Sequence, residues 1–148
     1  LTRGAQAEMR ALLLELRQDA LEGTDLADLL RQLCGIFAAN SVVELTLDLA
    51  EGVVLPPQTQ TVFYRVAQEA LNNVARHAQA AQVDVSLLRP DTGGLELIIK
   101  DDGRGFDPAS IPADHFGVRI MHERAAAVGA SLVVNTLPGH GTTVRLKL

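Results

Sequence analysis

The sequence predicts a two-layer α/β fold in which helices cover one face of a mixed, mainly antiparallel sheet. Apolar residues repeat at helical spacing in four segments, and five other segments show the alternation typical of strands. The chain has 148 residues, 47% of them hydrophobic, which suits one compact domain with its own core. We expect this domain to span residues 23–148, after a short leading helix in residues 1–22.

The first two helices are predicted from apolar stripes. One stripe lies near residues 5–17. Thr24 can cap the next helix, with Asp25 and Asp28 near its positive end. The second stripe has the i, i+3, i+4 and i+7 spacing of a buried helix face and consists of Leu26, Leu29, Leu30, Leu33 and Phe37.

The third and fourth helices frame the middle of the chain. Pro56 and Pro57 open the third helix, which we expect to continue to about Ala78. The fourth is predicted near residues 118–128 and ends at Gly129. The segment before it, from Asp102 to Phe116, contains two glycines and two prolines with little periodicity, so we predict a long loop.

Five strands complete the predicted sheet. The first alternates apolar and polar residues near residues 43–49, and two more form a hairpin around a turn that contains Asp91, Gly93 and Gly94. The predicted strands cover residues 43–49, 82–89, 94–101, 131–136 and 142–148.

Composition excludes several classes of function. The 13 basic and 18 acidic residues give a net charge of -5, without the basic run that a nucleic acid backbone requires. Cys34 is the single cysteine and lies in an apolar helical pattern, so we expect a core thiol and a reducing compartment. No apolar run approaches the roughly 20 residues of a membrane helix. We therefore expect a cytoplasmic domain that does not bind nucleic acid directly.

The third helix carries a polar stripe beside its buried face. Glu69, Asn73, Arg76 and His77 follow the spacing i, i+4, i+7 and i+8. A carboxylate and an amide one turn apart are oxygen ligands that suit Mg²⁺, and the two basic residues can meet the phosphates that such an ion carries. The alternative is an ordinary solvated face with a Glu69–Asn73 hydrogen bond.

Asp101 ends the third predicted strand on its core-facing side. It shares the parity of Leu95, Leu97 and Ile99, so its carboxylate should face inward and needs a donor partner. Glycines follow at positions 103 and 105 and leave room for a flat ring, such as adenine, whose exocyclic amine can donate to Asp101. The alternative is an Asp-Gly turn in which Asp101 accepts from its own backbone.

Thr142 opens the last strand with its hydroxyl on the core side. It has the parity of Val144 and Leu146, and it follows Gly139 and Gly141, which leave room for a ligand or a tight turn. The alternative is an ordinary glycine-rich hairpin.

Together these segments resemble a known family. Residues 69–77 read EALNNVARH, residues 101–105 read DDGRG and residues 139–142 read GHGT. In order and spacing they resemble the asparagine box and two glycine boxes of the histidine-kinase ATPase domain, the Bergerat-type fold shared with gyrase, Hsp90 and MutL. Residues 116–124, FGVRIMHER, resemble the subfamily of nitrate/nitrite sensors that pair with LuxR-type response regulators.

The resemblance implies a set of site residues. Asn73 would bind Mg²⁺ with the assistance of Glu69, which makes these two the catalytic and metal candidates. Asp101 would recognise the adenine amine, and Thr142 would hold Asp101 and a water near the base. The full ATP-binding set that the resemblance implies is Asn73, Arg76, His77, Asp101, Gly103, Gly105, Phe106, Gly117, Val118, Gly141 and Thr142.

The resemblance also implies partner proteins and a position for the phosphoacceptor histidine. The leading residues 1–22 would be the end of the dimerisation helices of a homodimer. The full-length protein would be anchored in the inner membrane and would signal to a response regulator with a LuxR-type helix-turn-helix. Relatives carry the phosphoacceptor as a histidine followed by an acidic residue on the first dimerisation helix.

The histidines of this chain do not fit that pattern. The chain has His77, His115, His122 and His140, and only His122 precedes an acid, in the helix after the loop. We therefore expect ATP binding without self-phosphorylation. Ile120 is a second departure, because many relatives have a glycine there.

Two alternative functions are considered. The first is an ATP-gated interaction module like the Hsp90, MutL and gyrase relatives, in which the chain hydrolyses ATP itself and Glu69 is the catalytic acid. The second is a degenerate domain that binds no nucleotide and acts as a partner surface.

Overall fold

The computed structural model describes residues 24–106 and 116–148. The helices are α2 (Leu26–Ala39), α3 (Pro57–Asn73), the π-helical η1 (Val74–Ala78) and α4 (Phe116–Ala127). The strands are β1 (Glu44–Leu49), β2 (Gln82–Leu88), β3 (Glu96–Asp101), β4 (Ser131–Thr136) and β5 (Thr142–Lys147). The helix predicted near residues 5–17 and most of the predicted loop lie outside the described residues.

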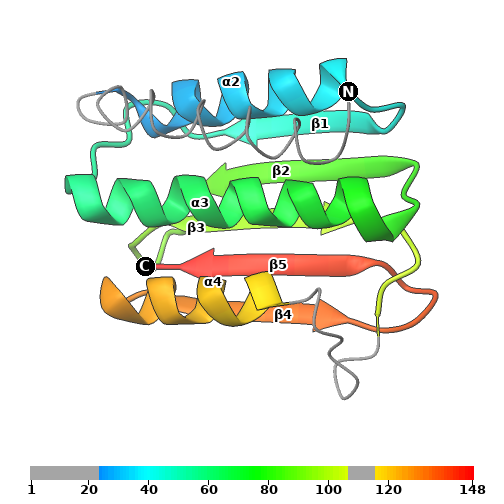
Figure 1. Cartoon of the computed structure of the whole chain (residues 1–148). Helices are drawn as coiled ribbons and strands as arrows, with labels where there is room; N and C mark the ends of the chain where they lie inside the picture. The colour runs from blue at the N-terminus through cyan, green and yellow to red at the C-terminus, as the bar shows by residue number, and fades with distance from the viewer. Residues whose placement is uncertain (1–23, 107–115) are drawn as a thin grey trace.

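The five strands form one mixed sheet in the order β1-β2-β3-β5-β4 (Figure 1). β1 pairs with β2 in parallel, and the other three pairings are antiparallel. Figure 1 shows α2, α3 and α4 side by side on the same face of this sheet. The predicted two-layer fold with a mainly antiparallel sheet is confirmed, and so is the β2–β3 hairpin.

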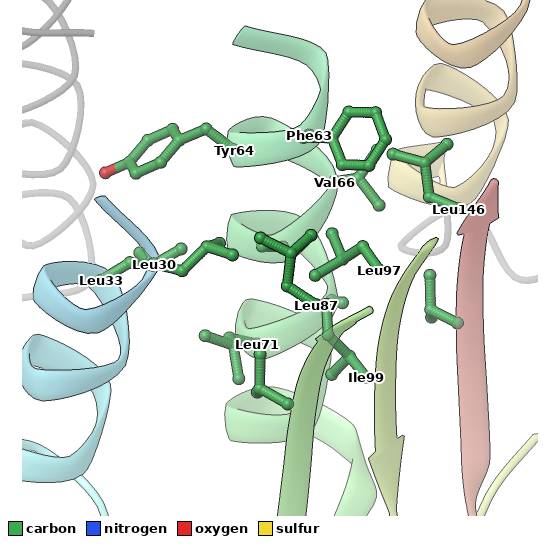
Figure 2. Close-up of a cluster of buried hydrophobic side chains, with 14 of the residues drawn as sticks. Leu30, Leu33, Phe63, Tyr64, Val66, Leu71, Leu87, Leu97, Ile99 and Leu146 are labelled. Atoms are coloured by element: carbon green, nitrogen blue, oxygen red, sulfur yellow. The ribbon is translucent and has the colours of Figure 1, made fainter. Parts of the chain in front are cut away.

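The core lies between the sheet and the helix layer. Strand partners that share the inner face run across the sheet in rows, such as Val85, Ile99 and Val144. Their side chains meet those of α2 and α3, and Figure 2 shows Phe63 and Leu97 in this cluster. Phe63 and Leu97 are both 0% exposed, so truncating Phe63 to alanine would cost about 3–5 kcal/mol of folding free energy.

Asp25, not Thr24, caps α2. The Asp25 carboxylate accepts a hydrogen bond from the Ala27 N–H at 2.9 Å, and its second oxygen accepts from the Gly52 N–H at 2.8 Å. Because one carboxylate satisfies the helix terminus and the loop after β1 together, the helix begins at Leu26. The prediction that Thr24 caps this helix is therefore wrong by one residue, whereas the acidic first turn with Asp28 is confirmed.

The third predicted helix changes its winding before it ends. α3 is α-helical as far as Asn73, and the next turn is the π-helix η1. Gln79 ends the turn with a left-handed backbone, φ +49°. A π turn contains more residues than an α turn, so α-helical spacing no longer predicts the direction of side chains beyond Asn73. Among the described helices, none is long and apolar enough to cross a bilayer.

Candidate functional site

A pocket opens between the helix layer and the ends of three strands. It holds about 480 Å³ of empty space, including the part open to solvent. Residues of α3, α4, β3, β4 and β5 and of the segment after β3 line it: Ala70, Asn73, Val74, Ile99, Asp101, Gly105, Phe106, Val118, Met121, Val134, Thr142 and Val144. Six of the residues predicted for the site are among them: Asn73, Asp101, Gly105, Phe106, Val118 and Thr142.

Asp101 is the buried acid of the pocket wall. It is 6% exposed, and its carboxylate accepts from the Gly103 N–H at 2.8 Å. Burial raises the pKa of Asp101, while hydrogen bonds from the Gly103 and Thr142 backbones oppose the rise and the charge of Asp102 adds to it. Asp101 therefore accepts from its own turn, as the alternative interpretation predicted, and it also lines the pocket, whereas its contact with adenine stays a prediction. Its remaining lone pairs can accept from a ligand donor.

The glycines beside Asp101 permit contact between backbone segments. Gly141 has φ +72°, and a Cβ there would overlap the carbonyl oxygen of Asp101. Gly105 has φ +62°, and a Cβ there would overlap the carbonyl oxygen of Leu137. The room predicted for a flat ligand at Gly105 is thus largely taken by the turn between β4 and β5. Gly105 still borders the pocket, whereas Gly103 is buried behind Asp101 and is not in the lining.

Thr136 joins these segments, although the sequence analysis did not single it out. It is 7% exposed, and its Oγ1 lies 2.9 Å from the Phe106 nitrogen and 2.9 Å from Thr142 Oγ1. Thr136 shares the parity of Leu132 and Val134 in β4, so strand alternation was the signal that placed its hydroxyl inward. We refer to Asp101, Thr136, Gly141 and Thr142 as the strand side of the pocket.

We refer to Asn73 and the residues predicted to lie beside it, Glu69, Arg76 and His77, as the helix side of the pocket. Asn73 is half-buried and lines the pocket. Glu69 is half-buried one turn earlier and outside the lining, and Arg76 is exposed and also outside it. Because η1 interrupts the α-helical spacing after Asn73, that spacing no longer places Arg76 and His77 on the face of Glu69 and Asn73, and the four-residue stripe stays a prediction. The side chain of His77 lies outside the described residues.

The other residues that the sequence analysis named lie in α4 and in the turn between β4 and β5. Val118 lines the pocket from the first turns of α4, and Gly117 precedes it in the same helix. His122 is exposed on α4, and His140 is exposed in the turn between β4 and β5. Among the described residues, no three His, Cys, Asp or Glu side chains gather as a metal site.

Cys34 belongs to the core and not to the site. Its side chain is 1% exposed, and burial raises the pKa of the thiol to about 12, so it is inert at neutral pH. The predicted core thiol is confirmed.

Comparison with known proteins identifies the class of protein to which this fold and pocket belong. Residues 58–148 match the family described as histidine kinase-, DNA gyrase B-, and HSP90-like ATPase. The chain belongs to this family. The match includes all four segments that carried the resemblance in the sequence.

Within this family, the chain is similar to sensor histidine kinases. It is 35% identical over 144 residues to the sensor histidine kinase LiaS of Bacillus subtilis, which covers 97% of this chain and 39% of LiaS. The histidine kinase domain of a blue-light activated kinase from Erythrobacter litoralis has the same fold, with a TM-score of 0.72 at 21% identity over 84% of this chain and 61% of that domain.

A third comparison involves a protein with a bound nucleotide analogue. Full-length ShkA in complex with AMPPNP matches with a TM-score of 0.66 at 19% identity, over 84% of this chain and 30% of ShkA. The chain therefore has the fold of these kinase domains, and it spans about two fifths of the length of LiaS.

Proposed function

We propose that this chain binds MgATP and presents its γ-phosphate to a histidine on a dimerisation helix, as the catalytic domain of a sensor histidine kinase. The observation that carries the proposal is the position of Asp101. A buried carboxylate at the wall of a largely apolar pocket suits a ligand that is flat, apolar on its faces and a hydrogen-bond donor at one edge. Adenine has these properties.

The apolar lining provides the faces of the base site. Ile99 and Val144 come from adjacent strands, and Met121 comes from α4. A purine between these side chains would bury its two faces, while its exocyclic amine donates to Asp101. AMPPNP, an ATP analogue, is bound in the ShkA structure of the same fold, which supports this choice of ligand.

Asn73 suits a divalent cation that arrives with the nucleotide. Its amide oxygen is a hard ligand at the pocket wall, and the Glu69 carboxylate is one helical turn away. Mg²⁺ usually takes only one or two protein ligands and completes its shell with phosphates and water, so the donor set fits. Such an ion neutralises phosphate charge when it is bound.

Arg76 and His77 remain proposed phosphate contacts. Both belong to η1, directly after Asn73, so a triphosphate that extends out of the pocket past Asn73 would reach this turn. The exposed guanidinium of Arg76 would then meet phosphate oxygens in solvent, where an ion pair contributes little affinity. We propose Gly103, Gly117 and Gly141 as pocket-shaping positions.

The proposal extends to the protein around the domain. Residues 1–22 would be the end of the dimerisation helices, and residues 23–148 the ATP-binding domain. The resemblance of residues 116–124 supports a response regulator of the LuxR type as the partner. The similarity to sensor histidine kinases supports a homodimer. It also supports a kinase domain on the cytoplasmic side of an inner membrane anchor.

Calorimetric titration with ATP, with and without Mg²⁺, tests the proposal. We expect saturable binding that tightens with Mg²⁺, and a loss of about tenfold or more in affinity in Asp101→Asn. Asp91→Asn, in the exposed β2–β3 turn, is the matched control and should bind as the parent does. Unchanged ATP affinity in Asp101→Asn would exclude the adenine assignment. Failure of the parent to bind ATP would favour the degenerate domain.

Hydrolysis by the chain itself is a weaker candidate. It needs a carboxylate that positions water beside the terminal phosphate, and Glu69 is the residue of this type on α3. Glu69 lies outside the pocket lining, which disfavours this role. Release of inorganic phosphate by the isolated chain, abolished in Glu69→Gln, would favour the ATP-gated module.

A further inference from the structure

The hydroxyl of Thr136 sits at the junction of three backbone segments. It lies at the end of β4, directly opposite Thr142 of β5, and it is nearly fully buried. Its Oγ1 is 2.9 Å from the Phe106 nitrogen, 2.9 Å from Thr142 Oγ1, and 3.4 Å from the carbonyl oxygens of Phe106 and Gly141. Two of its neighbours, Phe106 and Thr142, line the pocket.

Either hydroxyl can be the donor in the hydrogen bond between the two threonines, and the neighbours of Thr136 bear on which one donates. A hydroxyl has one proton and two lone pairs. The Phe106 N–H occupies one lone pair of Thr136. For its single proton, Thr142 Oγ1 is the nearest acceptor, 0.5 Å closer (3.4 against 2.9 Å) than either carbonyl oxygen. Donation to Thr142 would give the Thr136 proton the shortest of these three contacts.

The direction of that bond determines what Thr142 offers to a ligand. If Thr142 accepts from Thr136, its own proton can point into the pocket. If Thr142 donated to Thr136 instead, its hydroxyl would present only lone pairs to the pocket. With Thr136 as the donor, the strand side displays an acceptor at Asp101 and a donor at Thr142, which are paired residues on adjacent strands.

We propose that Thr136 is a positioning residue that determines base specificity by orienting the Thr142 hydroxyl as a donor. This inference rests on the proposed function. The Watson–Crick edge of a 6-aminopurine has a donor, its amine, beside an acceptor, its N1, and matches an acceptor beside a donor. A 6-oxopurine presents the reverse order and is mismatched at both positions. One bridging water at Thr142 would preserve the direction of donation.

Base discrimination separates this role from a purely structural one. ADP and GDP would be titrated against the parent chain, Thr136→Val, Thr136→Ser and Thr143→Val. Thr143 is the matched control, because it is next to Thr142 on β5 and has the opposite parity. We expect Thr136→Val to weaken ADP about tenfold and GDP by less than about threefold, because only adenine uses the donated proton. Thr136→Ser and Thr143→Val should keep the parent ratio.

A ligand lacking the acceptor provides an independent readout. 1-Deaza-ADP has a carbon in place of N1, so the parent should bind it more weakly than ADP. Thr136→Val should bind 1-deaza-ADP and ADP with equal affinity. If Thr136→Val does not fold, as judged by circular dichroism, Thr136→Cys serves instead, since a thiol is a poor donor.

The outcomes separate the inference from the proposed function. Equal weakening of ADP and GDP in the Thr136 variant, or an unchanged ratio, would overturn the inference and leave the function standing. A parent chain that binds neither ADP nor ATP would overturn both.

Discussion

The strand side and the helix side of the pocket are built in different ways. On the strand side, Asp101, Thr136 and Gly141 are buried, and backbone contacts between β3, β4 and β5 hold them. On the helix side, Asn73 is half-buried and the chain then enters a π turn in which Arg76 is exposed. One side is closed by the fold, and the other is open to solvent.

This difference matches the two parts of the proposed ligand. A rigid base gains affinity from donors and acceptors that are already fixed, because little ordering entropy is lost on binding. A triphosphate is heavily charged, and removing it from water would cost more than most contacts return. A half-exposed helix end therefore suits phosphates, and a buried strand end suits the base.

The largest expected effect comes from filling the backbone contact at Gly141. Gly141→Ala should destabilise the domain by more than about 3 kcal/mol, since the Cβ would overlap the Asp101 carbonyl and strain a φ of +72°. Gly139→Ala is the matched control, because φ is +80° there and no atom lies within 4 Å of the Cβ. Gly139→Ala should lower the free energy of unfolding only by the backbone strain, about 1–2 kcal/mol. Urea denaturation measures both, and equal losses would contradict a close contact at Gly141.

A substitution on the helix side should change metal dependence and spare the fold. Asn73→Ala should remove most of the tightening of ATP binding by Mg²⁺, about tenfold in affinity, because an oxygen ligand is lost. Asn72→Ala is the control, since Asn72 adjoins it on α3 and does not line the pocket. Calorimetric titration of both variants with ATP, with and without Mg²⁺, measures this change in affinity. The assignment fails if Asn73→Ala responds to Mg²⁺ as the parent does.

Asp102 connects the two sides, and its removal should have a smaller effect. Its Oδ1 accepts from the Ala81 and Gln82 N–H groups, both at 2.9 Å, and so fixes the chain after η1 to the end of β3. Asp102→Ala should cost about 1 kcal/mol, because these groups are partly exposed and water replaces the lost acceptor. Asp102→Asn keeps one oxygen and should retain most of the stability. Thermal denaturation tests the pair, and an equal loss in both variants would argue against the hydrogen bonds.

Strand alternation predicted the strand side better than helical spacing predicted the helix side. Asp101 and Thr142 were placed inward by parity, and both line the pocket because the β3–β5 register puts them opposite each other. Asn73 was placed correctly within the α-helical part of α3. Arg76 is exposed and outside the lining, and the π turn that contains it leaves no periodic signal in the sequence, so its phosphate contact stays a prediction.

Contacts between distant backbone segments were also beyond sequence patterns. Gly105 and Gly141 were predicted to leave room, but their neighbours are the carbonyl groups of Leu137 and Asp101. Thr136 was missed because its partners are backbone atoms of Phe106 and Gly141, whose proximity follows from the folded turn. The catalytic and ligand-binding roles of the predicted residues stay predictions that the variants above test.

The smallest expected effect is a pH dependence of folding stability, which arises from the buried Asp101 on the strand side. Burial holds the pKa of Asp101 above its ordinary value, so the unfolded chain ionises first as pH rises. The stabilising contribution of Asp101 is complete below the unfolded pKa and is lost as pH rises through the folded pKa. Asp101→Asn does not ionise, so its stability relative to the parent should increase from pH 3 to pH 7.

Urea denaturation of the parent and Asp101→Asn at both pH values measures this difference, in which the titration of all other groups cancels. A relative stability of Asp101→Asn that falls over the same range would contradict a raised pKa. With the expected sign, the buried carboxylate destabilises the empty domain at neutral pH. In the proposed function, a ligand donor would supply the partner that the fold alone does not fully provide.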